Sequence, residues 1–284
     1  MLLLALIVLP VLAAGVAAVL APMHTWKPDA YGEAPGVVGA LLAGGLTNCA
    51  FLALLRVFHI CRAAHESEYA GRLLILFGLL SIAVAAVFMV GQRDFKRMLA
   101  YSSIEHMGIL VLGVGLGGEG VFAALLHMLN NGLTKGVLFL SAANIHRAFD
   151  SKSIDQVRGA MRRVPFSGTL FLFGFFAITG SPPFGPFVSE FLILSRAFAA
   201  DRFLVGGGVL LLLLVVFVGM GRTVLTMLQG PPSPEAERTS YRDGWFTGLP
   251  VVFSLAIVLM LGLHIPSPLV SLLQEAAAFL ETVP

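Results

Sequence analysis

Long apolar runs separated by short polar stretches dominate the 284 residues of the chain. A helix rises by about 1.5 Å per residue, so each of eight runs is long enough to cross the apolar core of a bilayer. The runs lie at residues 2–21, 36–58, 72–91, 98–117, 121–145, 165–199, 203–228 and 245–264. A final amphipathic stretch, 268–280, is expected to lie at the membrane interface. The pattern predicts an all-α polytopic membrane protein with about eight transmembrane helices in a single membrane domain.

The run at 165–199 is interrupted by the sequence GSPPFGP. Proline removes a backbone donor and crowds the preceding turn, so this run is predicted to be a discontinuous helix. The residues of the break are Pro182, Pro183, Gly185 and Pro186. Glu190 follows the break, and an acid beside a broken membrane helix is typical of an ion-transfer site. The alternative is a proline-kinked packing helix whose Glu190 reaches the interface.

Polar residues recur at every fourth position in the run at 121–145. His127, Asn131 and Lys135 therefore lie on one face of the predicted helix. A lysine in the middle of a span costs about 3 kcal/mol unless it is paired or hydrated. The spacing favours a proton relay over the alternative of a polar stripe that joins helices through hydrogen bonds.

A second polar group opens the run at 98–117. Ser102, Glu105 and His106 lie within one helical turn on adjoining faces. A histidine can exchange protons near neutral pH, which suits a relay. Glu105 also lies close enough to the predicted end of the span to reach water, so both interpretations stay open.

Composition agrees with the pattern of runs. Hydrophobic residues make up 57% of the chain and charged residues 12%, with a mean hydropathy of +0.90, which excludes a soluble domain. No metal-ligand spacing, phosphate-binding loop or nucleophile pattern is present, so the sequence predicts no catalytic residue and no metal site, and no nucleic-acid partner is expected.

The positive charges are divided unequally between the loops. Twelve Lys and Arg residues lie in odd-numbered loops, with Lys27 counted in the first, and four lie in even-numbered loops. Short loops rich in Lys and Arg stay on the cytoplasmic side. The odd-numbered loops are therefore expected to be cytoplasmic, with both termini outside.

Several motifs, in a fixed order, resemble one family of membrane subunits. They are APMHTWKPDAYGEAP (21–35), RDFKRMLAYSSIEHMGI (93–109), HMLNNGLTKGVLFLSAANIHRAF (127–149) and GSPPFGPFVSEFLIL (180–194). Together they are similar to the antiporter-like subunits of respiratory complex I and of energy-converting hydrogenases. YSSIEHMG and LHMLNNGLTKG look most like hydrogenase-4 component F, which belongs to [NiFe]-hydrogenase and formate hydrogenlyase complexes.

The resemblance implies a domain organisation. Subunits of this family have two inverted five-helix repeats, each with one broken helix, and they carry protons through a central chain of buried Lys, His and Glu. By this resemblance, residues 1–58 are the remnant of a first repeat and residues 72–228 are the second repeat. Residues 245–284 then form a closing helix and an interfacial segment.

The resemblance also implies roles for single residues of the second repeat. Lys135 matches the family's central lysine, and His127 matches the histidine two turns before it. Asn131 stands where some members have another histidine. Glu190 matches the acid or lysine after the second break, and Lys96 matches the lysine of the turn that contains Arg93 and Asp94. Glu105 and His106 are the remaining predicted relay residues.

The first repeat departs from the family pattern. Ala17 stands where a lysine is expected, and Asn48 stands where Lys or His is common. Lys27 follows Trp26 where an apolar residue is more usual. The first proton half-path is therefore expected to be absent from this chain.

The resemblance implies a non-catalytic membrane subunit of an oxidoreductase complex, in the inner (plasma) membrane of a prokaryote. That complex is a proton-translocating [NiFe]-hydrogenase, a formate hydrogenlyase or a complex I-like enzyme. Its other membrane and peripheral subunits are the expected partners, and they are expected to carry the NiFe and iron–sulfur centres, because this chain holds no cofactor motif. The alternatives are a subunit of an Mrp-type cation/proton antiporter and a truncated scaffolding subunit without transport.

Overall fold

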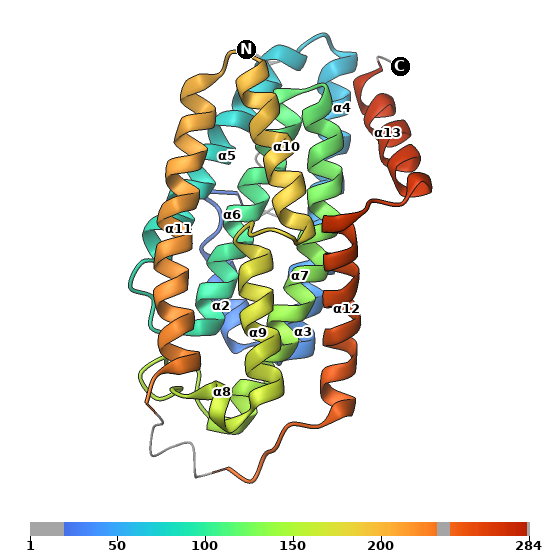
Figure 1. Cartoon of the computed structure of the whole chain (residues 1–284). Helices are drawn as coiled ribbons and strands as arrows, with labels where there is room; N and C mark the ends of the chain where they lie inside the picture. Colours follow the sequence, from blue (N-terminus) through green and yellow to red (C-terminus); the bar gives the residue numbers. More distant parts are fainter. Residues whose placement is uncertain (1–19, 232–238, 283–284) are drawn as a thin grey trace.

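The computed structural model describes residues 20–231 and 239–282, and within these ranges the regular elements are helices (Figure 1). Asp94 and Ser153 form an isolated β-bridge between two loops. The helices are α2 (Trp26–Glu33), α3 (Gly36–Leu41), the π-helical turn η1 (Leu42–Leu46), α4 (Thr47–Ala63), α5 (Ser67–Met89), α6 (Phe95–Leu116), α7 (Glu119–Phe149), α8 (Ala160–Arg163), α9 (Pro165–Ile178), α10 (Gly185–Ala199), α11 (Phe203–Gln229), α12 (Trp245–Leu263) and α13 (Ser267–Glu281). The predicted all-α class is confirmed.

The predicted runs from residue 36 to residue 264 each coincide with helices. Five helices are long and apolar enough to cross a membrane. They are Gly36–Ala63, which joins α3, η1 and α4, and the helices α5, α6, α11 and α12. The shorter apolar helix α9 adds to them. The predicted run at 2–21 lies almost wholly outside the described residues.

The long helix α7 is the centre of the bundle (Figure 1). It contacts α3, α6, α9, α10, α12 and α13. In the most apolar part of α6, 94% of the residues are buried inside the protein, against 28% in α11 and 22% in α12. The polar helices α6 and α7 therefore form the interior, and the most apolar helices lie at the periphery, where lipid would cover them.

The predicted break is confirmed. α9 ends at Ile178 and α10 begins at Gly185, with Pro186 in its first turn. Residues 179–184 cross between the two half-helices, near mid-height of the bundle (Figure 1). Gly180 has a φ of +64°, in the left-handed region that glycine adopts most readily.

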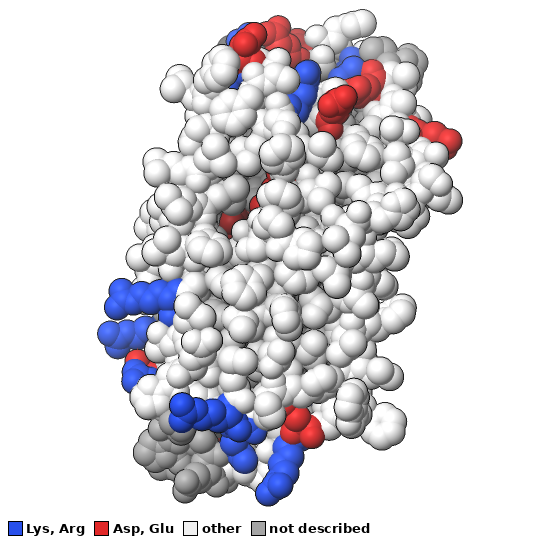
Figure 2. All heavy atoms as spheres, viewed as in Figure 1, with Lys and Arg blue, Asp and Glu red and all other residues white. Residues whose placement is uncertain are grey.

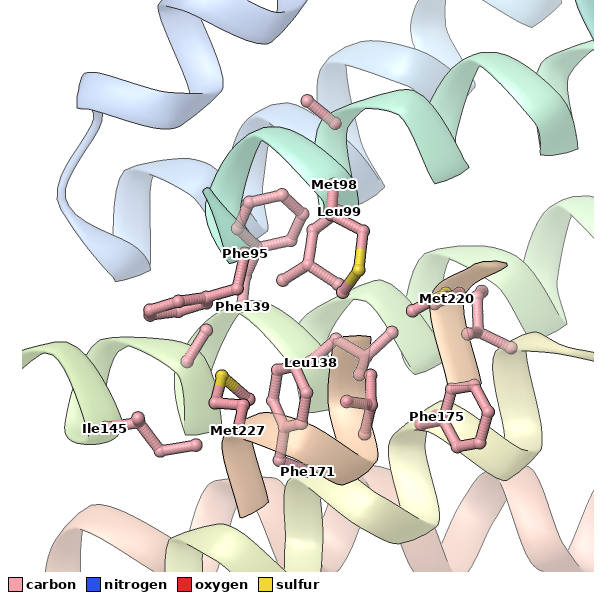
Figure 3. Packing of buried hydrophobic residues seen from close by; sticks show 14 of the residues in the cluster. Phe95, Met98, Leu99, Leu138, Phe139, Ile145, Phe171, Phe175, Met220 and Met227 are labelled. Carbon is pink, nitrogen blue, oxygen red and sulfur yellow. The ribbon is translucent and has the colours of Figure 1, made fainter. Parts of the chain in front are cut away.

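An apolar cluster fills the bundle between the break and the end of the molecule that carries α8. Its side chains come from α6, α7, α9 and α11 and pack face to face (Figure 3). We call its members on α6 and α7, namely Phe95, Leu99, Leu138, Phe139 and Ile145, the lower apolar cluster; each is fully buried. Buried polar side chains beside this cluster bond to their own helix or to each other, as Ser141 does to Val137 and Asn144 to Ser167.

The last two helices, α12 and α13, both pack against α7. α12 ends beside the break, since a Cβ atom at Gly262 would overlap the backbone around Pro183 and Phe184. α13 then packs beside α4 and α7 through Leu273, Ala277 and their neighbours. It coincides with the amphipathic stretch that we expected at the interface, and its place relative to a bilayer stays a prediction.

Charged side chains gather at the two ends of the molecule, and an apolar belt separates them (Figure 2). At the end that carries α8, loops are joined by ion pairs. Arg97 lies 2.6 Å from Asp29, and Lys152 pairs with Glu33. Figure 2 also shows a small acidic spot within the apolar middle of this face. The distribution is that of a protein surrounded by lipid at mid-height.

Candidate proton-relay site

A chain of hydrogen bonds crosses from α6 through α7 to α10. His106 Nδ1 lies 3.0 Å from His127 Nε2, and His127 Nδ1 lies 2.9 Å from the hydroxyl of Ser189. All three side chains are fully buried. Ser189 stands in the first turns of α10, directly after the break, so the break brings this hydroxyl to α7. The geometry is a continuous wire of groups that can each accept and donate a proton.

Glu190 lies at the end of this wire, against the break itself. Its Oε1 is 3.8 Å from His106 Nδ1, and the residue is 7% exposed. A Cβ atom at position 180 would overlap Glu190 Oε2, so the carboxylate occupies the space that Gly180 leaves open. The discontinuous helix therefore makes a pocket for an acid near the middle of the bundle.

Lys135 lies deeper along α7 and is fully buried. Its Nζ donates to Ser102 Oγ at 2.8 Å and to the carbonyl of Leu99 at 3.4 Å. Glu105 lies one turn after Ser102 on α6 and is also buried.

Glu105 is 2% exposed, so it does not reach the outer surface of the protein. This finding excludes the alternative that we left open for this residue. Across the described residues, no ion pair joins Lys135 directly to Glu190. Along α6, Glu105 follows Ser102, the partner of Lys135, and directly precedes His106. It therefore lies between the lysine's partner and the histidines on that helix.

Several polar atoms near this wire are buried without a hydrogen-bond partner in the described chain. They include both amide atoms of Asn131, Oδ1 of Asn130 and Oε1 of Glu190. Buried polar groups are nearly always satisfied, commonly by water. Asn131, which the sequence placed in the relay, is therefore suited to hold water between Lys135 and the histidines.

Lys96 is the predicted relay residue that lies apart from the others. It is 5% exposed and donates from Nζ to the carbonyl of Ala34 at 2.7 Å, at the end of α2. It lines an open pocket with Glu33 and His146 at the end of the molecule that carries α8. The lower apolar cluster lies between Lys96 and the other predicted relay residues.

The ligand atoms of His106, His127 and Glu190 lie within 4.8 Å of one another, and two imidazoles with a carboxylate are a ligand set that zinc and iron accept. His106 Nδ1 and both ring nitrogens of His127 make the hydrogen bonds described above, whereas Glu190 Oε1 and His106 Nε2 have no hydrogen-bond partner among the described residues.

Among the buried polar residues that were not predicted, Ser189 and Lys27 stand next to the relay or carry a charge. Ser189 was missed because a serine next to an acid carries no signal of its own; only its position directly after the break could have indicated it. Lys27, which we counted in a cytoplasmic loop, is fully buried at the start of α2. The single sequence signal was its departure from the apolar residue usual after Trp26.

In the first-repeat region, Asn48 packs against the interior of the bundle. Its Nδ2 lies close to Gly132 of α7, and its Oδ1 has no partner among the described residues. Ala17 lies outside the described residues. The departure of this region from the family pattern therefore stays a prediction.

Comparisons with known proteins agree with the motifs. The family described as "NADH:quinone oxidoreductase/Mrp antiporter, TM" matches residues 1–220. The hydrogenase-4 component F homolog of Methylacidiphilum infernorum (isolate V4) is 36% identical over 262 residues, covering 92% of this chain and 54% of that protein. NADH-quinone oxidoreductase subunit N of Salinispora arenicola (strain CNS-205) is 33% identical over 263 residues, covering 91% and 50%.

The fold is shared as well. The solved structure of the Mrp complex from Dietzia sp. DQ12-45-1b contains a chain that superimposes with a TM-score of 0.85 at 20% identity, over 96% of this chain and 59% of that one. At this identity the likeness shows the fold alone. The chain spans about half the length of the curated relatives it matches.

Proposed function

Because the chain belongs to the NADH:quinone oxidoreductase/Mrp antiporter family of membrane subunits, we propose that it moves protons as one subunit of a redox-driven membrane complex of the hydrogenase type. The observation that carries the proposal is the buried wire from His106 through His127 to Ser189, with Glu190 at one end and Lys135 beside it. A purely structural polar stripe would not need ionisable groups on three helices.

In the proposed mechanism, a proton passes between Lys135 and Glu190 in short steps. The hydroxyl of Ser102 and the carboxylate of Glu105 receive it on the lysine side. The two histidines and Ser189 form the hydrogen-bonded path between α6 and α10, and Glu190 exchanges the proton at the His106 end of this path. Buried charges at this spacing are coupled, so a proton that arrives at one group changes the proton affinity of the next.

The hydrogenase assignment rests on the match to hydrogenase-4 component F over nearly the whole chain. In this assignment the electron-transfer chemistry belongs to partner subunits, which would hold the NiFe and iron–sulfur centres. The family description, which also names the Mrp antiporter, favours a second candidate, a cation/proton antiporter subunit without a redox partner.

Purification of the full chain from its native membrane through an affinity tag separates these candidates. Co-purification of hydrogenase subunits supports the first, and an antiporter set without redox subunits supports the second. Isolation of the chain with neither would contradict both and leave the scaffolding alternative.

The relay itself is tested by Lys135→Arg. Arginine keeps the positive charge but does not release its proton near neutral pH. We expect the variant complex to assemble and turn over its electron donor while proton translocation into liposomes is lost. Lys152→Arg, the same change at a partly exposed lysine, is the matched control and should translocate normally. Full translocation by an assembled Lys135→Arg complex would refute the relay.

A further inference from the structure

A second buried lysine, Lys27, has no part in the relay described so far. It is fully buried in the first turn of α2. Its Nζ donates to the hydroxyl of Thr47 at 3.3 Å and lies 5.0 Å from the centre of the Tyr31 ring. An ammonium group has three donors, and in the described chain it meets one hydroxyl and one aromatic face.

The surroundings of Lys27 do not neutralise its charge. Its contacts in the described residues include no carboxylate. A lysine that serves packing alone is almost never fully buried unless it is paired. The structure therefore holds a buried amine whose charge is not fixed by an ion pair, which is the condition for a group that gains and loses a proton.

The polar groups around Lys27 are held by an irregular turn. The carbonyl of Leu42, at the start of η1, accepts from Tyr31 Oη at 2.8 Å and from Thr47 Oγ1 at 3.1 Å. A π-helical turn widens the helix and often marks a functional site. Here it fixes the Thr47 hydroxyl toward the amine of Lys27.

Tyr31 links Lys27 to the helix that carries Lys135. The ring of Tyr31 packs edge-on against Phe139, one turn after Lys135, at a centroid distance of 5.8 Å. α2 itself packs against α6, on the side of the break that carries α8 (Figure 1).

Two sets of polar groups lie beyond Lys135 in this direction; one runs from Asn144 of α7 through Ser167 to Asp243. Directly beyond Lys135, Leu138, Phe139 and Ile145 are fully buried members of the lower apolar cluster (Figure 3). The hydroxyl of Ser141 donates to its own helix. Lys27, Tyr31 and Thr47 form a polar group that passes to the side of this cluster, on α2 and α4.

We propose that Lys27 is an additional proton carrier, which takes the proton between Lys135 and the end of the molecule that carries α8. In this step one N–H bond breaks at one amine and one forms at the other, so the pair keeps its total number of protons. The inference rests on the proposed relay, because Lys27 has a proton to carry only if Lys135 exchanges one.

The test uses Lys27→Leu and Lys27→Arg in the affinity-purified complex. The complex is reconstituted into liposomes that contain a pH-sensitive dye, and proton movement is measured during turnover of its electron donor. We expect both variants to turn over and both to lose proton translocation. A role in packing or charge alone would be rescued by arginine, so full translocation by either assembled variant would overturn the proposal.

A pair of control variants and a substitute variant complete the experiment. Lys152→Leu and Lys152→Arg make the same changes at a partly exposed lysine and should translocate normally. If Lys27→Leu fails to assemble, Thr47→Val removes the hydroxyl that the amine contacts and should slow translocation; unchanged translocation there would also contradict the proposal.

Comparison with Lys135→Arg separates this inference from the relay. Loss in Lys135→Arg with full translocation in the Lys27 variants would refute the role of Lys27 alone. Full translocation in both would refute the proposed relay, and the role of Lys27 with it.

Discussion

Gly180 offers a direct test of whether the break positions the acid of the relay. Alanine at this position would place a methyl group where Glu190 Oε2 now lies. The carboxylate is the far end of a flexible side chain, so it can move away without disrupting the fold. It would then leave its place near His106, from which Oε1 is 3.8 Å distant. We expect Gly180→Ala to assemble and to lose most of its proton translocation.

The energetic cost of this change has two parts that can be separated. Gly180 has a φ of +64°, and a residue with a Cβ atom in the left-handed region costs about 1–2 kcal/mol. Gly91, in the loop after α5, has a φ of +79°, and a Cβ atom there would meet no atom within 4 Å. Gly91→Ala therefore carries the backbone strain of Gly180→Ala without the displacement of Glu190.

The assay compares the two variants in the purified complex. Thermal unfolding in detergent should show a similar, small loss of stability in both. Proton translocation per electron donor consumed should fall in Gly180→Ala and stay normal in Gly91→Ala. Equal translocation by the two variants would refute the view that the break holds Glu190 in its working position.

Two other predictions concern the wire and the topology. Ser189→Ala removes a hydrogen bond to His127 worth about 1 kcal/mol, so proton translocation should fall several-fold. The control is Ser141→Ala, at a buried serine that bonds only to its own helix, and it should leave translocation unchanged. Equal rates in the two variants would count against the wire. A cysteine at Ser153 should resist impermeant thiol reagents in intact cells and one at Ser67 should react, and the reverse pattern would overturn the expected orientation.

The sequence predicts the fold well because its signals are local. The apolar runs and the prolines of the break act within a few residues, and the structure confirms both. The spacing of His127, Asn131 and Lys135 likewise placed three polar residues in the interior of α7. Helical periodicity is enough to indicate which side chains share a face.

The pairing between helices could not be predicted in the same way. In the structure Lys135 donates to Ser102 and to the carbonyl of Leu99, and Glu190 lies 3.8 Å from His106. Which residue of one helix faces a given residue of another depends on packing, which no spacing within a helix records. The burial of Lys27 was missed for the same reason.

The hydroxyl of Ser189 allows the hydrogen bonds of the wire to run in either direction. Ser189 has one proton, and its nearest acceptors are the carbonyl of Pro186 at 3.0 Å and His127 Nδ1 at 2.9 Å, with the carbonyl of Gly185 at 3.3 Å. When the hydroxyl donates to Pro186, His127 Nδ1 must donate to Ser189, and His127 Nε2 accepts from His106. When it donates to His127, every bond of the wire is reversed.

Both arrangements leave the two histidines neutral and keep the bonds between His106, His127 and Ser189, so neither is strongly preferred by the burial of charge. A wire that has passed one proton is left in the reversed arrangement and must be reset before it can pass the next in the same direction. Each histidine returns to its first tautomer only by losing a proton at one ring nitrogen and gaining one at the other, whereas the Ser189 hydroxyl needs only to rotate toward Pro186. In the proposed relay, the hydroxyl at position 189 therefore keeps a hydrogen-bond partner in both arrangements of this chain of neutral groups.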